Sequence, residues 1–291
     1  MPDTMQASLL QCERESLSTL FALAHARQRE AQARAPQPPR FLLESARSMA
    51  AHLARDDTQM RASLDALALW QFYLPAAMGT SSWDFAMARE CLPVSFARVH
   101  AALQALETRP QLVIVAYHMA GFPLLSSLVG SALSTMRRRP LHMLVATNNL
   151  GWLKRAVERW NEPDAHFIGT QPRDMRLLLG GLRDGSIERL LILVDGPHAP
   201  GPAGTRALPG ISPGLGFRTP LLERLHALGL PLLPITHHWH DEQLVVTPHA
   251  LLDPARVDAT ATIDAIAAHI ETLLRAQPEQ WLNWAAARIR T

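Results

Sequence analysis

Two short apolar runs constrain the fold of this chain more than any other feature. They are residues 111–118 (QLVIVAYH) and 189–195 (RLLILVD), and both are continuous rather than alternating. Continuous runs of this kind are typical of strands buried on both faces, as in a parallel sheet. Each run ends in a polar residue, His118 or Asp195. The sequence therefore predicts a buried parallel sheet with polar groups at the carboxyl ends of its strands.

Helical and strand-like segments alternate after Gln111, which is the signature of βαβ units. The pattern predicts helices over residues 124–136, 152–160, 174–181, 217–228 and 262–276, and strands over 142–147, 165–168, 232–237 and 243–247, the last two as a hairpin. We therefore expect an α/β fold, with a mostly parallel central sheet flanked by helices.

The first third of the chain reads as helical. Leucines and Phe21 recur at helical intervals in residues 7–34, and a proline-rich connector follows. Further helices are expected over residues 41–55, 58–74 and 83–107, with Pro75 and Gly79 ending the second of them. The chain thus divides into an N-terminal helical section, residues 1–95, and an α/β core, residues 96–291.

Charge and cysteine content exclude several classes of protein. The 28 Lys and Arg residues nearly balance 26 Asp and Glu, so no nucleic-acid partner is expected. Arg137 to Arg139 form the compact basic run, which fits either a solvated helix end or a contact for an anionic carrier or head group. Cys12 and Cys91 are too far apart in sequence for a metal-type spacing, and a reducing compartment is expected.

The sequence shows neither a signal-peptide layout nor an apolar run long enough to span a bilayer. These features predict a cytoplasmic protein. The amphipathic N-terminal helices are explained by packing onto the core, or alternatively by peripheral contact with the inner membrane or with another protein.

His118 and Asp195 are the candidate catalytic residues. Open α/β sheets place their ligand crevices at the carboxyl ends of the strands, where both residues are expected. An imidazole there is suited to take a proton from a hydroxyl or amine. The structural alternatives are a histidine that is hydrogen-bonded in the core and an aspartate that forms a turn before Gly196-Pro197.

Residues 196–216 are rich in glycine and proline and are expected to form a loop whose backbone a ligand can approach closely. The candidate substrate-binding residues are Gly121, Gly196, Arg206, Gly210 and Arg218. The loop matches neither nucleotide-binding fingerprint, so no cofactor is expected. The segment 236–242 (THHWHDE) is rich in metal-ligand types, but no further ligand is set by spacing, so no metal is expected either.

Four stretches together carry a resemblance to a known family. They are FARVHAALQALETRPQLVIVAYHMAGFP, RLLILVDGPHAPG, LPGISPGLGFRTPLLERLHALGLPLLPITHHW and IAAHIETLLRAQPEQWLNWAAARIR, which span roughly residues 96–290. The chain resembles the lipid A biosynthesis lauroyl/myristoyl acyltransferases, a branch of the lysophospholipid acyltransferase superfamily. The most specific stretch is residues 278–284 (PEQWLNW), which is similar to the family's closing signature.

This resemblance implies transfer of a fatty acyl group from an acyl-carrier protein or acyl-CoA thioester to a hydroxyl or amine, with His118 as the general base. In the family the fifth residue after the histidine is an acid that orients it, whereas Pro123 stands at that position here. Asp195 is the candidate replacement. The alternative is a non-catalytic protein that binds acyl groups or carrier proteins and has lost the acid. The family's usual membrane-spanning helix is also missing from this sequence, which points to a soluble or carrier-bound acceptor.

Overall fold

The computed structural model describes residues 2–35, 37–80, 85–136, 140–146, 165–198 and 203–287. Its centre is a six-stranded sheet in the order β3-β2-β4-β1-β8-β9. The strands are β1 (Leu112–Ala116), β2 (Leu141–Leu144), β3 (Ala165–Ile168), β4 (Arg189–Leu193), β8 (Leu232–His240) and β9 (Gln243–Pro248). The first five in this order are parallel, and β9 is antiparallel to β8. The predicted α/β class, the mostly parallel sheet and the closing hairpin are confirmed.

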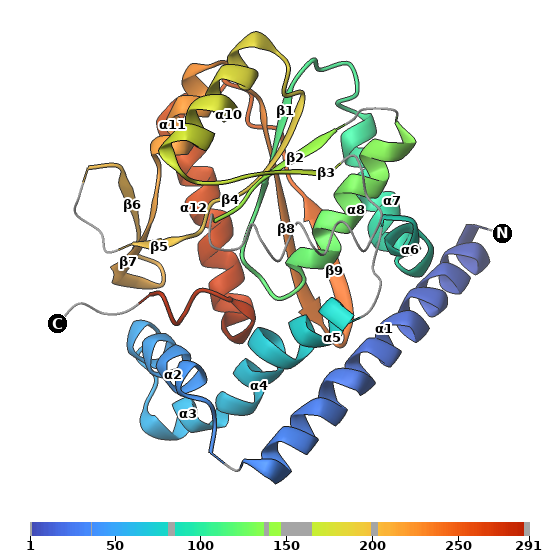
Figure 1. Ribbon diagram of the computed structural model, residues 1–291, viewed down its shortest axis with the longest axis vertical. Coiled ribbons are helices and arrows are strands. Elements are labelled where there is room, and N and C mark those ends of the chain that lie inside the picture. Colours follow the sequence, from blue (N-terminus) through green and yellow to red (C-terminus); the bar gives the residue numbers. More distant parts are fainter. Residues whose placement is uncertain are drawn as a thin grey trace.

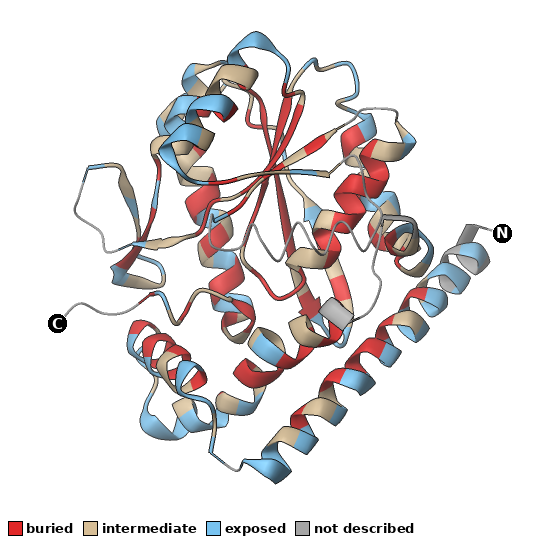
Figure 2. Cartoon of the chain, viewed as in Figure 1, coloured by how far each residue is buried: buried red, intermediate tan, exposed pale blue. Residues whose placement is uncertain are grey.

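The continuous apolar runs form the middle of this sheet. Every residue of β1 is buried, and Ile114 pairs with Leu191 of β4 on one side and Leu233 of β8 on the other. Strands covered on both faces need apolar side chains on both faces, which explains why these runs do not alternate. Figure 2 shows the buried residues concentrated along these strands and on the helix faces that meet them.

Helices cover both faces of the sheet. They are α6 (Phe85–Cys91), α7 (Pro93–Gln104), α8 (Phe122–Thr135), α10 (Pro172–Asp184), α11 (Pro220–Ala227) and α12 (Ala259–Ala276). α8 connects β1 to β2 in one direction across the sheet, and α10 connects β3 to β4 in the other, so right-handed crossovers put them on opposite faces. Figure 1 shows α7 and α8 on one side and α10, α11 and α12 on the other.

The N-terminal helices are α1 (Pro2–Arg34), α2 (Arg40–His52), α3 (Asp57–Ala62), α4 (Leu64–Ala68), the π-helix η1 (Leu69–Tyr73) and α5 (Leu74–Thr80). The expectation that Pro75 ends a helix is wrong. Pro75 lies directly after the π turn, where it is accommodated, and the helix continues past it to Thr80.

These helices pack at the end of the sheet where the parallel strands finish (Figure 1). Trp70 of η1 and Phe21 of α1 both contact Trp239 of β8, with ring centroids 6.3 and 5.1 Å away. Glu13 of α1 accepts hydrogen bonds from two backbone N–H groups in the first turn of α7. The helical section therefore shares the core of the sheet, and a division after residue 95 falls inside α7.

The expected loop over residues 196–216 is wrong in part. β5 (Pro197–His198), β6 (Thr205–Leu208) and β7 (Ser212–Arg218) form an antiparallel sheet in the order β5-β7-β6. A Cβ at Gly216 would lie 2.6 Å from the carbonyl oxygen of Arg206, so this glycine lets two strands approach closely. The helix expected from residue 217 starts later, because β7 includes Phe217 and α11 begins at Pro220.

Two predicted features fall outside the described residues: the basic run 137–139 and the helix over 152–160. Among the helices that the structure does describe, none has the length and apolar character needed to cross a bilayer.

Candidate active site

His118 and Asp195 lie side by side at the carboxyl ends of β1 and β4. The two strands are parallel neighbours, and the last registered pair is Ala116 with Leu193. Both polar residues stand two positions beyond this pair, so the strand register brings them together. The Nδ1 atom of His118 is 2.8 Å from Oδ1 of Asp195. The sequence placed these two residues on one rim, and the structure makes them hydrogen-bonded partners.

Asp195 is a buried carboxylate with a full set of donors. Its side chain is 2% exposed, and both of its oxygens accept from the backbone N–H of His118, at 3.0 and 2.9 Å. The indole Nε1–H of Trp281 donates to Oδ2 at 2.7 Å. Burial by itself would raise the pKa of Asp195, but the His118 imidazole and these hydrogen bonds outweigh it and hold the pKa below its usual value. Asp195 is therefore ionised at neutral pH.

This carboxylate sets the orientation of His118. A carboxylate only accepts hydrogen bonds, so Nδ1 carries the proton and Nε2 presents a lone pair. The His118 side chain is 32% exposed, and no described residue hydrogen-bonds to Nε2. The pair thus has the chemistry of an oriented general base: one nitrogen held by an anion, the other open to a substrate proton.

The segment after α12 closes the site from the C-terminal side. The backbone N–H of Leu282 donates to the carbonyl of His118, and that of Ala120 donates to the carbonyl of Gln280. The side chain of Gln280, 1% exposed, bonds to both the N–H and the carbonyl of Trp239 in β8, each at 2.7 Å. Sequence reasoning singled out residues 278–284 as a signature but assigned them no role. Their role in the structure is to hold His118 and Asp195 in place.

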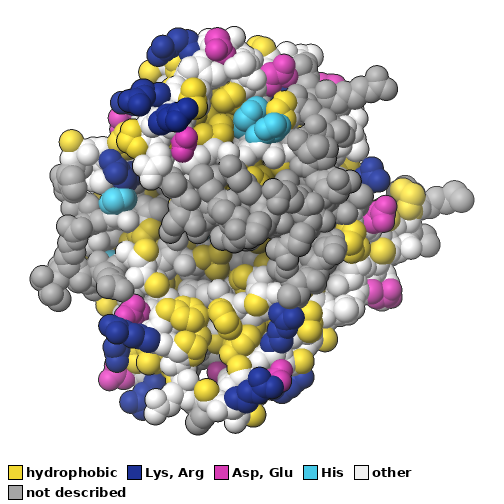
Figure 3. Space-filling model, in the orientation of Figure 1, with side chains coloured by type: hydrophobic (Ala, Val, Ile, Leu, Met, Phe, Trp, Pro, Cys, Tyr) yellow, Lys and Arg dark blue, Asp and Glu magenta, His cyan; other side chains and the backbone are white. Residues whose placement is uncertain are grey.

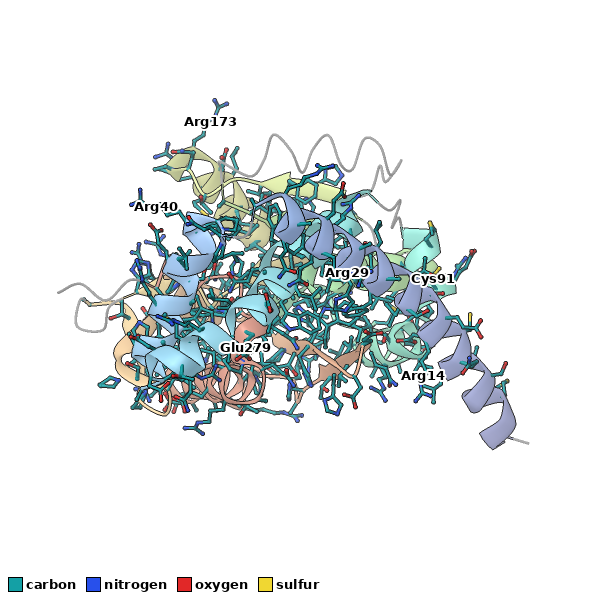
Figure 4. The ribbon with its side chains drawn as sticks, turned by 90° about the horizontal axis from the view of Figure 1, so that it is seen from below. Arg14, Arg29, Arg40, Cys91, Arg173 and Glu279 are labelled. Carbon is teal, nitrogen blue, oxygen red and sulfur yellow. The ribbon has the colours of Figure 1, made fainter. Side chains whose placement is uncertain are left out.

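The N-terminal helices in turn support this segment. Gln71 of η1 donates to the carbonyl of Trp281, and Arg55 forms a 2.6 Å ion pair with Glu279. Figure 4 shows Glu279 close to the pale-blue N-terminal helices. The helical section, which had no functional interpretation from sequence, therefore contributes to the architecture of the site.

His237 of β8 is a second histidine close to the pair, and sequence analysis noticed it only within the rejected metal-ligand segment. It is fully buried, and neither ring nitrogen has a well-aligned hydrogen-bond partner among the described residues. Burial lowers the pKa of His237 to about 4, an effect that the Met119 main chain and the Asp195 carboxylate only partly oppose. His237 is therefore a neutral core residue beside the site.

Of the five candidate substrate-binding residues, one lies beside the His118–Asp195 pair, and the other four have packing contacts, bonds to α12 or an exposed position. Gly196 follows Asp195 directly, and a Cβ there would have none of the described residues within 4 Å, so the backbone leaves space beside the pair. A Cβ at Gly121 would instead lie 2.6 Å from Leu244, which makes this glycine a packing residue.

The next two candidates contact α12. Arg206 pairs with Asp264 of this helix at 2.6 Å, and Gly210 bonds through its backbone to Glu271 and Arg275. Arg218 is exposed at the end of β7. Of the five, the structure brings Gly196 next to the His118–Asp195 pair.

Within the described residues, no group of three or more His, Cys, Asp or Glu side chains could hold a metal ion. A hollow of about 350 Å³ lies elsewhere, between α10 and the β2–β3 edge, where the rings of His142 and His166 stack at 5.3 Å. It includes neither His118 nor Asp195, and its position does not add to the chemistry of the pair.

Comparison with known proteins adds no identity to this geometry. No family model matches the chain, and no significant match is found among curated proteins.

Proposed function

We propose that this protein is an acyltransferase in which His118 acts as the general base and Asp195 as its orienting acid. The donor is a fatty acyl thioester of an acyl-carrier protein or of coenzyme A, and the acceptor is a hydroxyl or an amine. The observation that carries the proposal is the 2.8 Å contact between His118 Nδ1 and Asp195 Oδ1, in a histidine whose side chain is 32% exposed. The resemblance to the lipid A acyltransferases supplies the reaction class.

In the proposed reaction, Nε2 of His118 takes the proton of the acceptor as its oxygen or nitrogen attacks the thioester carbonyl. The new C–O or C–N bond forms, the C–S bond breaks, and the proton passes from the imidazolium to the departing thiolate. The ionised Asp195 stabilises the imidazolium through its charge, as the aspartate does in a catalytic triad. The open backbone at Gly196 leaves space for the reacting group beside the pair.

The surface offers apolar area for an acyl donor or a membrane lipid. Figure 3 shows hydrophobic side chains gathered on the lower part of one face, over the N-terminal helices, with basic groups at its edges. Phe41 of α2 and Phe72 of η1 are exposed and contact each other at a centroid distance of 5.7 Å. We propose that the protein is cytoplasmic and that it contacts its carrier protein, or the inner membrane peripherally, through such surfaces.

A second candidate is a non-catalytic protein that binds acyl groups or carrier proteins. Pro123 favours it, because the family's acid is missing at that position. The hydrogen bond that His118 donates to Asp195 favours the enzyme instead, because a protein that only binds needs no oriented base.

The test is mass-spectrometric measurement of thioester consumption by the purified protein with long-chain acyl-carrier protein and with acyl-CoA. Wild type is compared with His118→Ala and with His240→Ala, whose side chain is 65% exposed and serves as the matched control. Consumption that His118→Ala abolishes and His240→Ala preserves supports the enzyme. Donor binding without consumption, equal in all three proteins, overturns the role of His118 and supports the binding protein.

A further inference from the structure

A serine and a histidine meet at the junction of α2 and β7, away from the His118–Asp195 pair. The Nδ1 atom of His52, in the last turn of α2, is 3.0 Å from Oγ of Ser212, the first residue of β7. The Nε2 atom of the same ring is 2.9 Å from the carbonyl oxygen of Ala287. Figures 1 and 4 both show α2 beside the small sheet that contains β7.

The carbonyl of Ala287 determines which nitrogen of His52 carries the proton. A carbonyl oxygen only accepts hydrogen bonds, so Nε2 must donate to it. In the neutral ring Nδ1 then has the lone pair, and the hydroxyl of Ser212 must donate to Nδ1. This is the relation between a nucleophilic serine and its general base, with a backbone carbonyl in the place of the orienting acid.

His52 is held rigidly in this position. It is 5% exposed, and its ring stacks on Trp284 at a centroid distance of 6.1 Å. The same Ala287 carbonyl also accepts a hydrogen bond from Ser48, one turn earlier in α2. An imidazole that is fixed by packing and by a hydrogen bond at its far nitrogen loses little entropy when it acts as a base.

Ser212 is reachable and lies at an irregular point of its sheet. The register of the β6–β7 pair shifts next to Ser212, and such bulges often occur beside functional sites. Pro213 and Gly214 are exposed, and a Cβ at Gly214 would lie 3.8 Å from both Ser212 Oγ and the His52 ring, so the missing side chain leaves an approach open. The backbone N–H of Gly214 also donates to Oγ at 3.3 Å, which favours negative charge on that oxygen.

The local sequence Gly210-Ile211-Ser212-Pro213-Gly214 fits the letters of the G-x-S-x-G nucleophile motif. It lies on a β-hairpin rather than on the strand-to-helix turn in which that motif normally works. The letters therefore add nothing by analogy, and the inference rests on the geometry of the Ser212–His52 contact.

We propose that Ser212 is a nucleophile of this protein, at a site separate from the His118–Asp195 pair, and that it accepts an acyl group from an activated ester or a thioester. Oγ attacks the carbonyl carbon while its proton moves to Nδ1 of His52. The new C–O bond forms, the C–O or C–S bond to the leaving group breaks, and the proton passes to the departing alkoxide or thiolate. The product is an O-acyl serine at residue 212. This proposal does not depend on the role of His118.

The experiment is incubation of the full chain with p-nitrophenyl acetate, with peptide mass spectrometry to locate acetyl groups and absorbance to follow p-nitrophenolate. Acetylation concentrated on Ser212 is expected, with the exposed Ser186 as an internal control. Ser212→Ala should abolish the adduct, Ser212→Cys should keep one at residue 212, and His52→Gln should slow its formation about 10²-fold or more, the usual contribution of a general base.

His118→Ala should label at the wild-type rate, which separates this proposal from the proposed function. Absence of a Ser212 adduct in the wild-type protein would overturn the inference, and so would labelling that His52→Gln leaves unchanged. If Ser212→Ala lowers the melting temperature while wild type gives no adduct, the contact only fastens α2 to β7.

Discussion

Two histidines at the same level of neighbouring strands have opposite surroundings. The β1–β8 ladder pairs Val115 with Pro234, and His118 and His237 each stand three residues further along. His118 is one-third exposed and bound to a carboxylate at 2.8 Å. His237 is fully buried, without a well-aligned partner among the described residues. A histidine at this level of the sheet is therefore not by its position alone a base.

The difference shows which physical term decides the protonation of each ring. Burial raises the free energy of the protonated imidazole, because the charge loses its hydration. This desolvation lowers the pKa of His237 and keeps the ring neutral down to about pH 4. His118 has an anion beside Nδ1 and a side chain that is 32% exposed, which is the arrangement that a general base requires. The partner carboxylate, more than the strand position, separates the candidate base from the structural residue.

The largest expected effect comes from removing the carboxylate of Asp195, the partner that distinguishes His118 from His237. The quantity affected is the rate of the proposed reaction. Asp195→Asn should reduce the rate of thioester consumption by about 10²- to 10⁴-fold, because the imidazolium loses its counter-charge and the amide can favour the wrong tautomer. The measurement is the initial rate at saturating donor. Far-ultraviolet circular dichroism must match wild type, since the amide oxygen can still accept from Trp281. A loss smaller than tenfold would show that Asp195 does not orient the base.

The second prediction concerns the free energy of unfolding, which should fall on acidification because His237 is neutral in the folded protein. The unfolded chain protonates this residue near pH 6.5 and the folded protein only near pH 4, so its contribution to stability is complete above about pH 6.5 and is lost as the pH falls to about 4. The expected loss is about 3 kcal/mol, from the energy of each pKa unit.

The measurement is the urea midpoint of wild type and of His237→Leu at several pH values from 7.5 to 4. Leucine has a similar volume and no titratable group, so the variant should lose less stability on acidification than wild type. Asp195 and His269 titrate in both proteins and cancel in the comparison. Identical pH profiles would contradict a buried neutral His237.

The smallest effect concerns Pro123, which stands where the acyltransferases that the sequence resembles have an acid. Pro123→Glu should change the rate of thioester consumption by less than about threefold, or under ~1 kcal/mol, because Asp195 already occupies Nδ1 of His118. Pro123 lies in the first turn of α8, where an acidic residue suits the helix dipole, so the fold should tolerate the change. A rise above tenfold would mean that the orientation supplied by Asp195 is incomplete.

Local sequence was sufficient for the sheet and for the catalytic candidates. Continuous apolar runs require burial on both faces, and parallel neighbours of equal register carry His118 and Asp195 to one edge. The helical character of the first third was also predictable, because amphipathic spacing is a local property. Residues 196–216 were misread, since strand pairing among glycines and prolines depends on contacts between distant segments.

Sequence by itself determined the α/β class, the buried strands and the pairing of a histidine with an aspartate on one rim, because these follow from periodicity and strand register. Tertiary structure alone decided that Trp281 and Leu282 fix the pair, that His237 stays neutral and that His52 faces Ser212. Those outcomes depend on burial and on hydrogen bonds between residues far apart in the chain, and neither is encoded in a local pattern.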